Sequence, residues 1–313
     1  MNPERLGIVI VNWNGRRLLE ACLRSVYEDP AGRAAMVCVV DNASQDESAA
    51  MVKERFAAVR LVESATNLGF AKACNLGLKE LGAADAVLFL NPDAAAQGRA
   101  ISRMLACLRA RPDAGAVTCA LIDGRGRFQE AQGHRLPSPR TAFNQYFFLS
   151  RLSDALFPGI FLSRRPSGTA EVEWISGAAM MVRGAALDGS PFFNEEYFMY
   201  AEDMEASLTL RRKGWKLLFI SDAEMVHHVK QSTSRTGPRI FNTQVSSQLL
   251  FFRKHYSSRE AWSMRWIMAA GHALRLCAHA VLGLARGQAA HRGKAASQWR
   301  LLRHMLGREA ACG

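Results

Sequence analysis

Amide and acidic side chains follow three short apolar runs in the first hundred residues. Asn12, Asp41 and Asp93 each stand at or just beyond the end of a run. The runs are 6–11, 36–40 and 86–90. A carboxylate placed there can accept a hydrogen bond from a nucleotide base or ribose, or bind a divalent cation. Alone, Asp41 is more typical of a turn residue that caps the next helix, and Asp93 of a simple loop aspartate.

A glycine with small and amide neighbours opens a predicted helix over 70–81. Asn67, Gly69 and Asn75 lie in the stretch NLGFAKACN. A backbone without a side chain can approach a ligand closely, and a helix N-terminus favours phosphate. Ordinary glycine packing is an equal alternative. The pattern is not G-x-G-x-x-G, which weighs against a nicotinamide cofactor.

Asn91-Pro92-Asp93 ends the third apolar run. Proline terminates the strand and leaves the carboxylate of Asp93 at the edge of the predicted sheet. Mg²⁺ or Mn²⁺ typically takes one or two protein carboxylates and completes its shell with substrate phosphates and water. A single aspartate suits such a cation.

Two later pairs carry further chemistry. Glu202 and Asp203 follow the aromatic-rich stretch 192–200, and apolar surroundings raise the pKa of a carboxylate toward that of a general base. Adjacent acids also complement a helix N-terminus, which is the alternative. His227 and His228 offer imidazole ligands that could join Asp93 on a metal, although such pairs are more often structural.

Strands alternating with helices must position these groups. Strands are predicted at 6–11, 36–40, 59–62, 86–90, 177–182 and 215–220, with helices between the first four and at 202–213. This spacing predicts an α/β fold with a mostly parallel sheet, in which ligands bind at the carboxyl ends of the strands. The stretch 126–173 is predicted to be irregular and to lie beside the site.

Charge is unevenly distributed over the 313 residues. The net charge is +12, and residues 229–313 hold 14 Lys and Arg against two acids, so the first 228 residues are neutral. The tail is therefore expected to meet an anionic surface. The seven cysteines form no C-x-x-C pair and are typical of reduced core residues, and no secretory signal is recognised at the N-terminus.

The tail contains two predicted helices, 262–286 and 288–308. Arg265, His272, His279 and Arg286 recur every seven residues and share one helical face. Such a stripe would suit a helix lying in a membrane interface, with its basic face toward anionic headgroups. The alternative is a helix packed on the catalytic domain with a solvated basic face.

The order and spacing of the motifs resemble family 2 glycosyltransferases of the GT-A fold, in particular the bacterial rhamnosyltransferase-like branch. The resemblance covers about residues 6–230. It is carried by the following segments: VIVNWNG (9–15), VVDNASQD (39–46), NLGFAKACN (67–75), LNPD (90–93), ISGAAM (175–180), YAED (200–203), RRKGW (211–215) and VHH (226–228).

The resemblance implies a role for each position. Donor-binding residues would be Asn12, Asp41, Asn67, Gly69, Asn75 and Asn91. Asp93 and His227 would hold a divalent cation, Mg²⁺ or Mn²⁺. Asp203 would be the general base, and Glu202, Trp174 and Gly177 would lie on the acceptor side. Many relatives carry an acid where this chain has Asn91, so Asp93 must anchor the cation without a second carboxylate.

The implied protein is an inverting glycosyltransferase that moves a sugar, L-rhamnose from dTDP-rhamnose being favoured, to a glycan or lipid-linked acceptor. Its catalytic domain would be 1–230, with nucleotide-sugar binding over 1–125 and the acceptor side over 126–230. The extension 231–313 would meet an anionic membrane from the cytoplasmic side. The alternatives are a nucleotidyltransferase and a protein that binds nucleic acid through its tail, although no nucleic-acid module is recognised. Homo-oligomerisation stays open.

Overall fold

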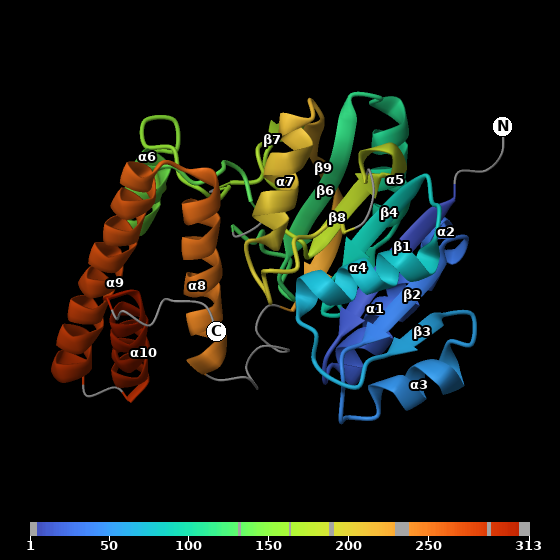
Figure 1. Ribbon diagram of the computed structural model, residues 1–313, viewed down its shortest axis with the longest axis horizontal. Coiled ribbons are helices and arrows are strands. Elements are labelled where there is room, and N and C mark those ends of the chain that lie inside the picture. The colour runs from blue at the N-terminus through green and yellow to red at the C-terminus, as the bar shows by residue number, and fades with distance from the viewer. Residues whose placement is uncertain are drawn as a thin grey trace. The chain divides into compact units, whose positions relative to one another are not determined.

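The computed structural model describes residues 5–130, 133–162, 164–187, 191–228, 238–286 and 289–306. The chain forms two compact units. The first, residues 1–136 and 164–235, is an α/β unit, and the second, residues 137–163 and 236–313, is helical where described (Figure 1). The segment 137–163 therefore belongs with the C-terminal helices, whereas the sequence placed it on the acceptor side of the catalytic domain.

The first half of the α/β unit is a parallel sheet of order β3-β2-β1-β4. Its strands are β1 (Leu6–Asn12), β2 (Met36–Asp41), β3 (Arg60–Glu63) and β4 (Ala86–Leu90). The connecting helices are α1 (Arg16–Glu28), α2 (Pro30–Arg33), α3 (Ser48–Arg55) and α4 (Phe70–Leu81). Parallel strands need such crossovers. The apolar runs of β1, β2 and β4 are buried, whereas the edge strand β3 is partly exposed.

The second half of the sheet is mixed, in the order β4-β8-β6-β9-β5, with β7 paired to β9. Its strands are β5 (Ala94–Gln97), β6 (Ala114–Ile122), β7 (Thr169–Val172), β8 (Ala179–Arg183) and β9 (Lys216–His227). The helices here are α5 (Ala100–Ala110) and α7 (Glu202–Arg212). Among the described strands only β5, β7 and β8 run against the others, so the expected mostly parallel sheet is confirmed.

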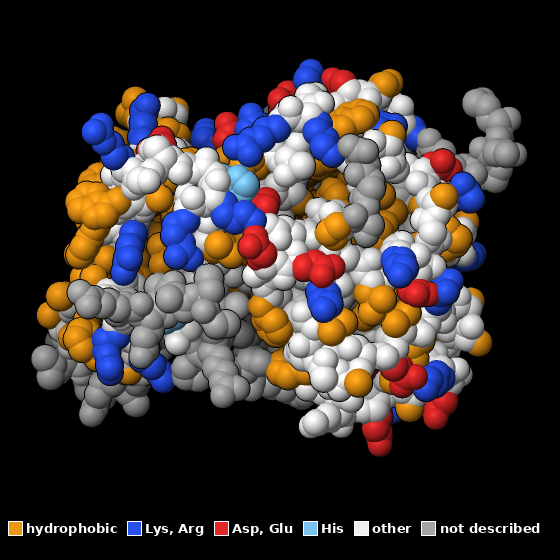
Figure 2. Space-filling view, viewed as in Figure 1, with side chains coloured by type: hydrophobic (Ala, Val, Ile, Leu, Met, Phe, Trp, Pro, Cys, Tyr) orange, Lys and Arg blue, Asp and Glu red, His pale blue; other side chains and the backbone are white. Residues whose placement is uncertain are grey.

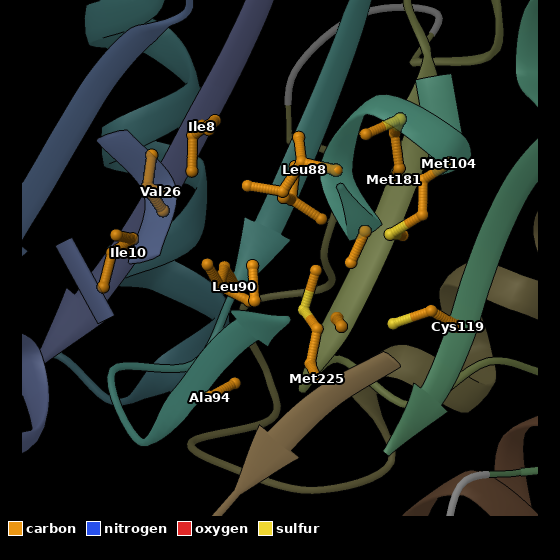
Figure 3. Packing of buried hydrophobic residues seen from close by; sticks show 14 of the residues in the cluster. Ile8, Ile10, Val26, Leu88, Leu90, Ala94, Met104, Cys119, Met181 and Met225 are labelled. Carbon is orange, nitrogen blue, oxygen red and sulfur yellow. The ribbon is translucent and has the colours of Figure 1, made fainter. Parts of the chain in front are cut away.

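One continuous apolar core lies against this sheet (Figure 3). Side chains from the two halves meet in it, Ile10 and Leu90 from the parallel half and Met181 and Met225 from the mixed half. Cys22, Cys38, Cys74 and Cys119 are buried free thiols, as expected, whereas Cys277 is exposed. Because the core spans both halves, it fixes the strand ends that carry the polar groups.

The helical unit contains α6 (Pro139–Tyr146), α8 (Pro238–His255), α9 (Ser258–Arg286) and α10 (Ala289–Leu306). Three contacts join α9 to α10 in antiparallel order. Arg265 donates to the carbonyl oxygen of Met305, His272 hydrogen-bonds Gln298 over 2.7 Å, and His279 approaches His291 at 3.2 Å between Nδ1 atoms.

These contacts correct the expectation for the tail. The stripe of Arg265, His272 and His279, predicted to face lipid headgroups, lies against α10. Buried polar groups need hydrogen-bond partners, and α10 supplies them. The side chain of Arg286 lies outside the described residues. Where the structure describes helices, none is long and apolar enough to cross a membrane.

Candidate active site

The carboxyl ends of β1 and β2 hold a buried polar cluster. Asn12 and Asp41 are paired in the sheet register, and Asn12 Nδ2 donates to Asp41 Oδ1 over 3.2 Å and to Ser44 Oγ over 3.1 Å. Asp41 Oδ2 accepts from the Ser44 backbone N–H. Both side chains are almost fully buried, and Asn12 Oδ1 has no hydrogen-bond partner. The cluster therefore keeps an acceptor for an incoming N–H or O–H group.

Asn42, which the sequence did not single out, fixes the loop before α4. Its Nδ2 donates to Asn67 Oδ1 over 2.9 Å and to the Gly69 carbonyl over 3.1 Å, while its Oδ1 accepts from the Leu68 N–H. Gly69 has φ of +82°, and an added Cβ would lie 2.4 Å from the Phe198 carbonyl oxygen. Only glycine fits there, which brings the loop against the segment that leads to α7.

Asn75 also holds that segment. Its Nδ2 donates to the Phe193 carbonyl over 2.7 Å and to Glu195 Oε1 over 3.1 Å, and its Oδ1 accepts from the Phe193 N–H. Each of these contacts is made with the chain itself. Asn75, expected to bind the donor, thus has a structural role in positioning the aromatic segment.

Asp93 and His227 lie together at the end of β4 and the end of β9. Asp93 Oδ1 is 3.2 Å from His227 Nε2, and both side chains are largely buried. The pairing of β5 with β9 brings Ala94 opposite His227, and the His228 N–H donates to the Asp93 carbonyl. His227 thus ends a long strand, Lys216–His227, whereas the sequence predicted that this strand ends at residue 220.

Gln129 orients this imidazole. Its Oε1 lies 3.1 Å from His227 Nδ1, and its Nε2 donates to the His227 carbonyl. A proton on Nδ1, donated to Gln129, leaves Nε2 as the metal-binding nitrogen, and such outer partners commonly orient histidine ligands. No sequence motif points to Gln129, because it lies in the stretch predicted to be irregular.

The pair fits a small divalent cation. Two ligands at about 2.1 Å on adjacent positions of an octahedral ion lie roughly 3 Å apart, close to the 3.2 Å separation here. No cluster of three or more His, Cys, Asp or Glu side chains able to hold a metal occurs within the described ranges. A cation held by Asp93 and His227 would therefore need oxygens from substrate or water. Asn91 contacts Ala178, Ala94 and Cys22 through its backbone N–H and carbonyl groups.

Asp203 is linked to the β4 terminus through the backbone. The Gly177 N–H donates to Asp203 Oδ2 over 2.9 Å, and the neighbouring Ala178 carbonyl accepts from the Asn91 N–H over 3.0 Å. Asp203 Oδ1 accepts from the Met204 N–H. A Cβ on Gly177 would lie 3.2 Å from the Phe70 ring, so the absence of a side chain keeps this link close.

The acidic pair at the start of α7 is desolvated. Burial raises the pKa of Asp203 to about 6, although its hydrogen bonds from Gly177 and Met204 oppose the shift. Glu202 is almost fully buried; burial first, and the charge of Asp203 second, raise its pKa well above the ordinary value. Glu202 Oε2 has no hydrogen-bond partner. The carboxyl of Asp203 therefore titrates closer to neutral pH than an exposed aspartate, and Glu202 holds its proton more tightly than an exposed glutamate does.

The backbone before α7 is strained. Tyr200 and Ala201 both have positive φ, 69° and 66°, which costs about 1–3 kcal/mol for each such residue. Glu205, one turn on, accepts from Tyr197 Oη and from Asn194 Nδ2. These bonds hold the segment in place and keep the two acids at the helix start.

Trp174, expected on the acceptor side, is 4% exposed. A Cβ on Gly133 would lie within 3 Å of its ring, and the Ile175 N–H donates to Ser207 on α7. Trp174 therefore supports the 174–178 segment and does not offer its ring to solvent.

The polar groups thus share one edge of the sheet. Asn12 and Asp41 end strands parallel to β4, which leads to Asp93. Ligands of α/β sheets bind at this edge. Transfer of a group from a nucleoside diphosphate requires three parts. These are acceptors for the base or ribose, a pair of side chains that can bind a cation, and a carboxylate with a raised pKa.

One protein is similar in sequence over most of the chain. An N-acetylglucosaminyl-diphospho-decaprenol L-rhamnosyltransferase of Mycobacterium tuberculosis, found in two strains, is 28% identical over 294 residues, which cover 86% of this chain and 91% of the relative. Its alignment extends well into the helical unit.

Solved structures share the fold. A mannosyltransferase from Pyrobaculum calidifontis in complex with GDP-mannose and Mn²⁺ has a TM-score of 0.60 at 18% identity, with 99% of this chain and 89% of that chain covered. GalNAc-T7 with UDP, GalNAc and Mn²⁺ has a TM-score of 0.52 at 14% identity, over 72% of this chain and 44% of that one. The expected GT-A fold is confirmed.

Residues 7–167 match the family described as Glycosyl transferase family 2, which is about half of the chain and includes Asn12, Asp41 and Asp93. With the rhamnosyltransferase relative and the fold, this match makes the protein a glycosyltransferase. The chain belongs to glycosyl transferase family 2.

Proposed function

We propose that this enzyme transfers L-rhamnose from dTDP-rhamnose to a polyprenol-linked acceptor, with inversion at the anomeric carbon. The observation that carries the proposal is the half-buried Asp203 carboxylate, with its pKa raised to about 6, linked through Gly177 and Ala178 to the strand end that leads to Asp93. The choice of sugar and acceptor rests on the M. tuberculosis relative, whose name specifies a diphospho-decaprenol acceptor.

The chain's own residues would share the work as follows. Asp41 and Asn12 receive the thymine or the ribose, and the unpartnered Asn12 Oδ1 accepts one of its hydrogen bonds. Asp203 accepts the proton of the acceptor hydroxyl as that oxygen attacks the anomeric carbon. With one base and one in-line displacement the configuration inverts, and no enzyme nucleophile is needed.

Asp93 and His227 would hold a divalent cation against the diphosphate of the donor. When bound, the cation supplies Lewis-acid stabilisation of the negative charge that grows on the departing nucleoside diphosphate. The separation of the two ligand atoms supports the assignment, as does Mn²⁺ in the related mannosyltransferase. We place the enzyme at the cytoplasmic face of the membrane, where a lipid-linked acceptor would meet the donor.

A donor panel tests the proposal. The full-length protein is heated with dTDP-rhamnose, UDP-glucose, UDP-N-acetylglucosamine or GDP-mannose, each with and without Mn²⁺. A ligand that binds only the folded protein raises the unfolding temperature. The expected result is the largest rise with dTDP-rhamnose plus Mn²⁺, and a larger rise with another donor would overturn the sugar assignment.

A further inference from the structure

The exposed face of α9 is apolar along most of its length. From residue 262 to residue 281 every exposed residue is apolar. They are Trp262, Trp266, Ala270, Leu274, Cys277, Ala278, Ala280 and Val281. Helical spacing places Trp262, Trp266, Leu274 and Val281 on one side of the helix, over about 29 Å at 1.5 Å per residue. We call this stripe the apolar face.

Between residues 262 and 281, the Arg and His side chains of the same helix are partly buried and contact other residues of the unit. Arg265, His272 and His279 contact α10, and the guanidinium of Arg275 lies 5.4 Å from the centre of the Tyr146 ring and 4.5 Å from that of Phe148. A helix on the surface of a water-soluble protein has the opposite arrangement. Polar groups satisfied inside a helical bundle, with apolar groups outside, are typical of a surface that meets lipid.

Other exposed apolar residues belong to the same unit. Of the twelve large hydrophobic side chains found exposed in the described residues, ten lie in the helical unit. Leu152 and Leu156 are the most exposed of them, at 76% and 68%. On α10, Trp299 lies among the exposed basic residues Arg300 and Arg303. Figure 2 shows orange side chains along the left edge, where α9 lies, with Lys and Arg in blue beside them.

Charge selects the partner of this surface. The helical unit holds 14 Lys and Arg against three acids. A symmetric contact between two copies would bring together two surfaces with the same excess of Lys and Arg, and like charges oppose such a contact. An anionic bilayer complements both features, because its headgroups attract basic side chains and its interface accepts tryptophan.

We propose that the apolar face of α9 lies in the interfacial region of an anionic bilayer, parallel to the membrane plane. The apolar side chains enter the lipid, and the basic residues beside them meet the headgroups. The proposal rests on the proposed function for its purpose, since a lipid-linked acceptor lies in the same bilayer. It differs from an attachment by charge alone, because insertion of the apolar face persists when salt screens the headgroups.

The test is vesicle flotation of the full-length protein. The vesicles contain 30% phosphatidylglycerol in phosphatidylcholine, at 0.1 and 0.5 M NaCl. Leu274→Glu places a charge on the apolar face, and Met36→Glu places the same charge at an exposed apolar position of the α/β unit. We expect the wild type and Met36→Glu to float equally at both salt concentrations. Leu274→Glu should need at least roughly tenfold more lipid, because a carboxylate enters apolar surroundings at high cost.

Two further measurements separate the outcomes. Brominated lipids should quench tryptophan fluorescence, and Trp262→Phe with Trp266→Phe should remove most of that quenching. Equal flotation of Leu274→Glu and Met36→Glu would overturn the proposal. So would a Leu274→Glu variant that floats normally but changes from dimer to monomer in sedimentation, which would assign the face to a second copy.

Donor turnover is measured alongside, without vesicles and with a short water-soluble acceptor. Leu274→Glu should leave this turnover unchanged, because the substitution lies outside the catalytic unit. Equal flotation of Leu274→Glu and Met36→Glu, with turnover of dTDP-rhamnose intact, would contradict only the membrane proposal. If Leu274→Glu floats less than the wild type but the wild type does not turn over dTDP-rhamnose, only the proposed function would be contradicted.

Discussion

The Gly177 N–H donates to the carboxylate of Asp203 over 2.9 Å, and this bond joins the start of α7 to the strand end that leads to Asp93. The next residue, Ala178, accepts from Asn91, so Asp203, the proposed base, and Asp93, the proposed cation ligand, are positioned by the same two strands. The relation explains how groups 110 positions apart in sequence can act on one substrate.

Asp203→Asn should abolish transfer while leaving donor binding nearly intact. The amide oxygen can still accept from Gly177, but it cannot take a proton. Loss of a general base costs on the order of 10²–10⁴-fold in kcat. Single-turnover rates and dTDP affinity by calorimetry check this, with the exposed Asp222→Asn as the control. Near-wild-type turnover would remove Asp203 from this role.

The pH dependence of kcat/KM should show the titration of the same group. Because burial raises the pKa of Asp203 to about 6, the base is protonated and inactive below that pH. Activity should therefore rise with pH through about 6 and level off above it. A profile that falls with pH over this range would mean that the group measured acts as an acid.

Glu202→Gln should make folding stability less dependent on pH. The folded protein holds a proton on Glu202 at pH values where the unfolded chain has lost it. Stability is therefore lost as pH rises above the unfolded value of about 4.5. Gln keeps the shape without the titration. Urea unfolding from pH 4.5 to 8 should show a smaller loss for the variant, and parallel curves would refute a protonated Glu202.

Asp93→Ala should weaken Mn²⁺ and dTDP binding together, because a cation would join the carboxylate to the diphosphate. We expect His227→Ala to cost less than Asp93→Ala, and Gln129→Ala to lower metal affinity by roughly 10–100-fold through loss of imidazole orientation. Calorimetry with and without EDTA measures each. If dTDP binds equally well in EDTA and to Asp93→Ala, the pair does not hold a cation.

Gly69→Ala should destabilise the α/β unit more than Gly82→Ala. Both glycines have positive φ, 82° and 67°, with ψ of 179° and −149°, a region essentially restricted to glycine, so each substitution costs about 1–3 kcal/mol through the backbone. Only at Gly69 would the new Cβ also meet the Phe198 carbonyl, at 2.4 Å; around Gly82 nothing lies within 4 Å. Urea unfolding compares the free energies of unfolding of the two variants. Equal losses would show that the loop at Gly69 moves away from the new Cβ without a cost in stability.

The parallel half of the fold could be predicted from sequence because each strand is an apolar run followed by a polar turn. The mixed half was harder, since the strands at 94–97 and 114–122 lie close to helical stretches and their order depends on long-range pairing. Asn12, Asp41, Asp93, Asp203 and His227 could be proposed from sequence because they belong to motifs. Asn42 and Gln129 were missed because they act through other side chains.

The tail shows how periodicity alone can mislead. A seven-residue repeat of Arg265, His272 and His279 defines a helical face correctly, but it does not say whether water, lipid or another helix covers that face. In the structure the partners on α10 cover it, which leaves the apolar residues outside.

The central claim is tested most directly by one reaction. The full-length enzyme is mixed with dTDP-rhamnose, Mn²⁺ and a polyprenyl-diphosphate-linked N-acetylglucosamine, and the products are identified by mass spectrometry. The account predicts addition of one deoxyhexose to the acceptor with release of dTDP, and loss of both with Asp203→Asn. Release of pyrophosphate, or an equal yield from Asp203→Asn, would contradict it.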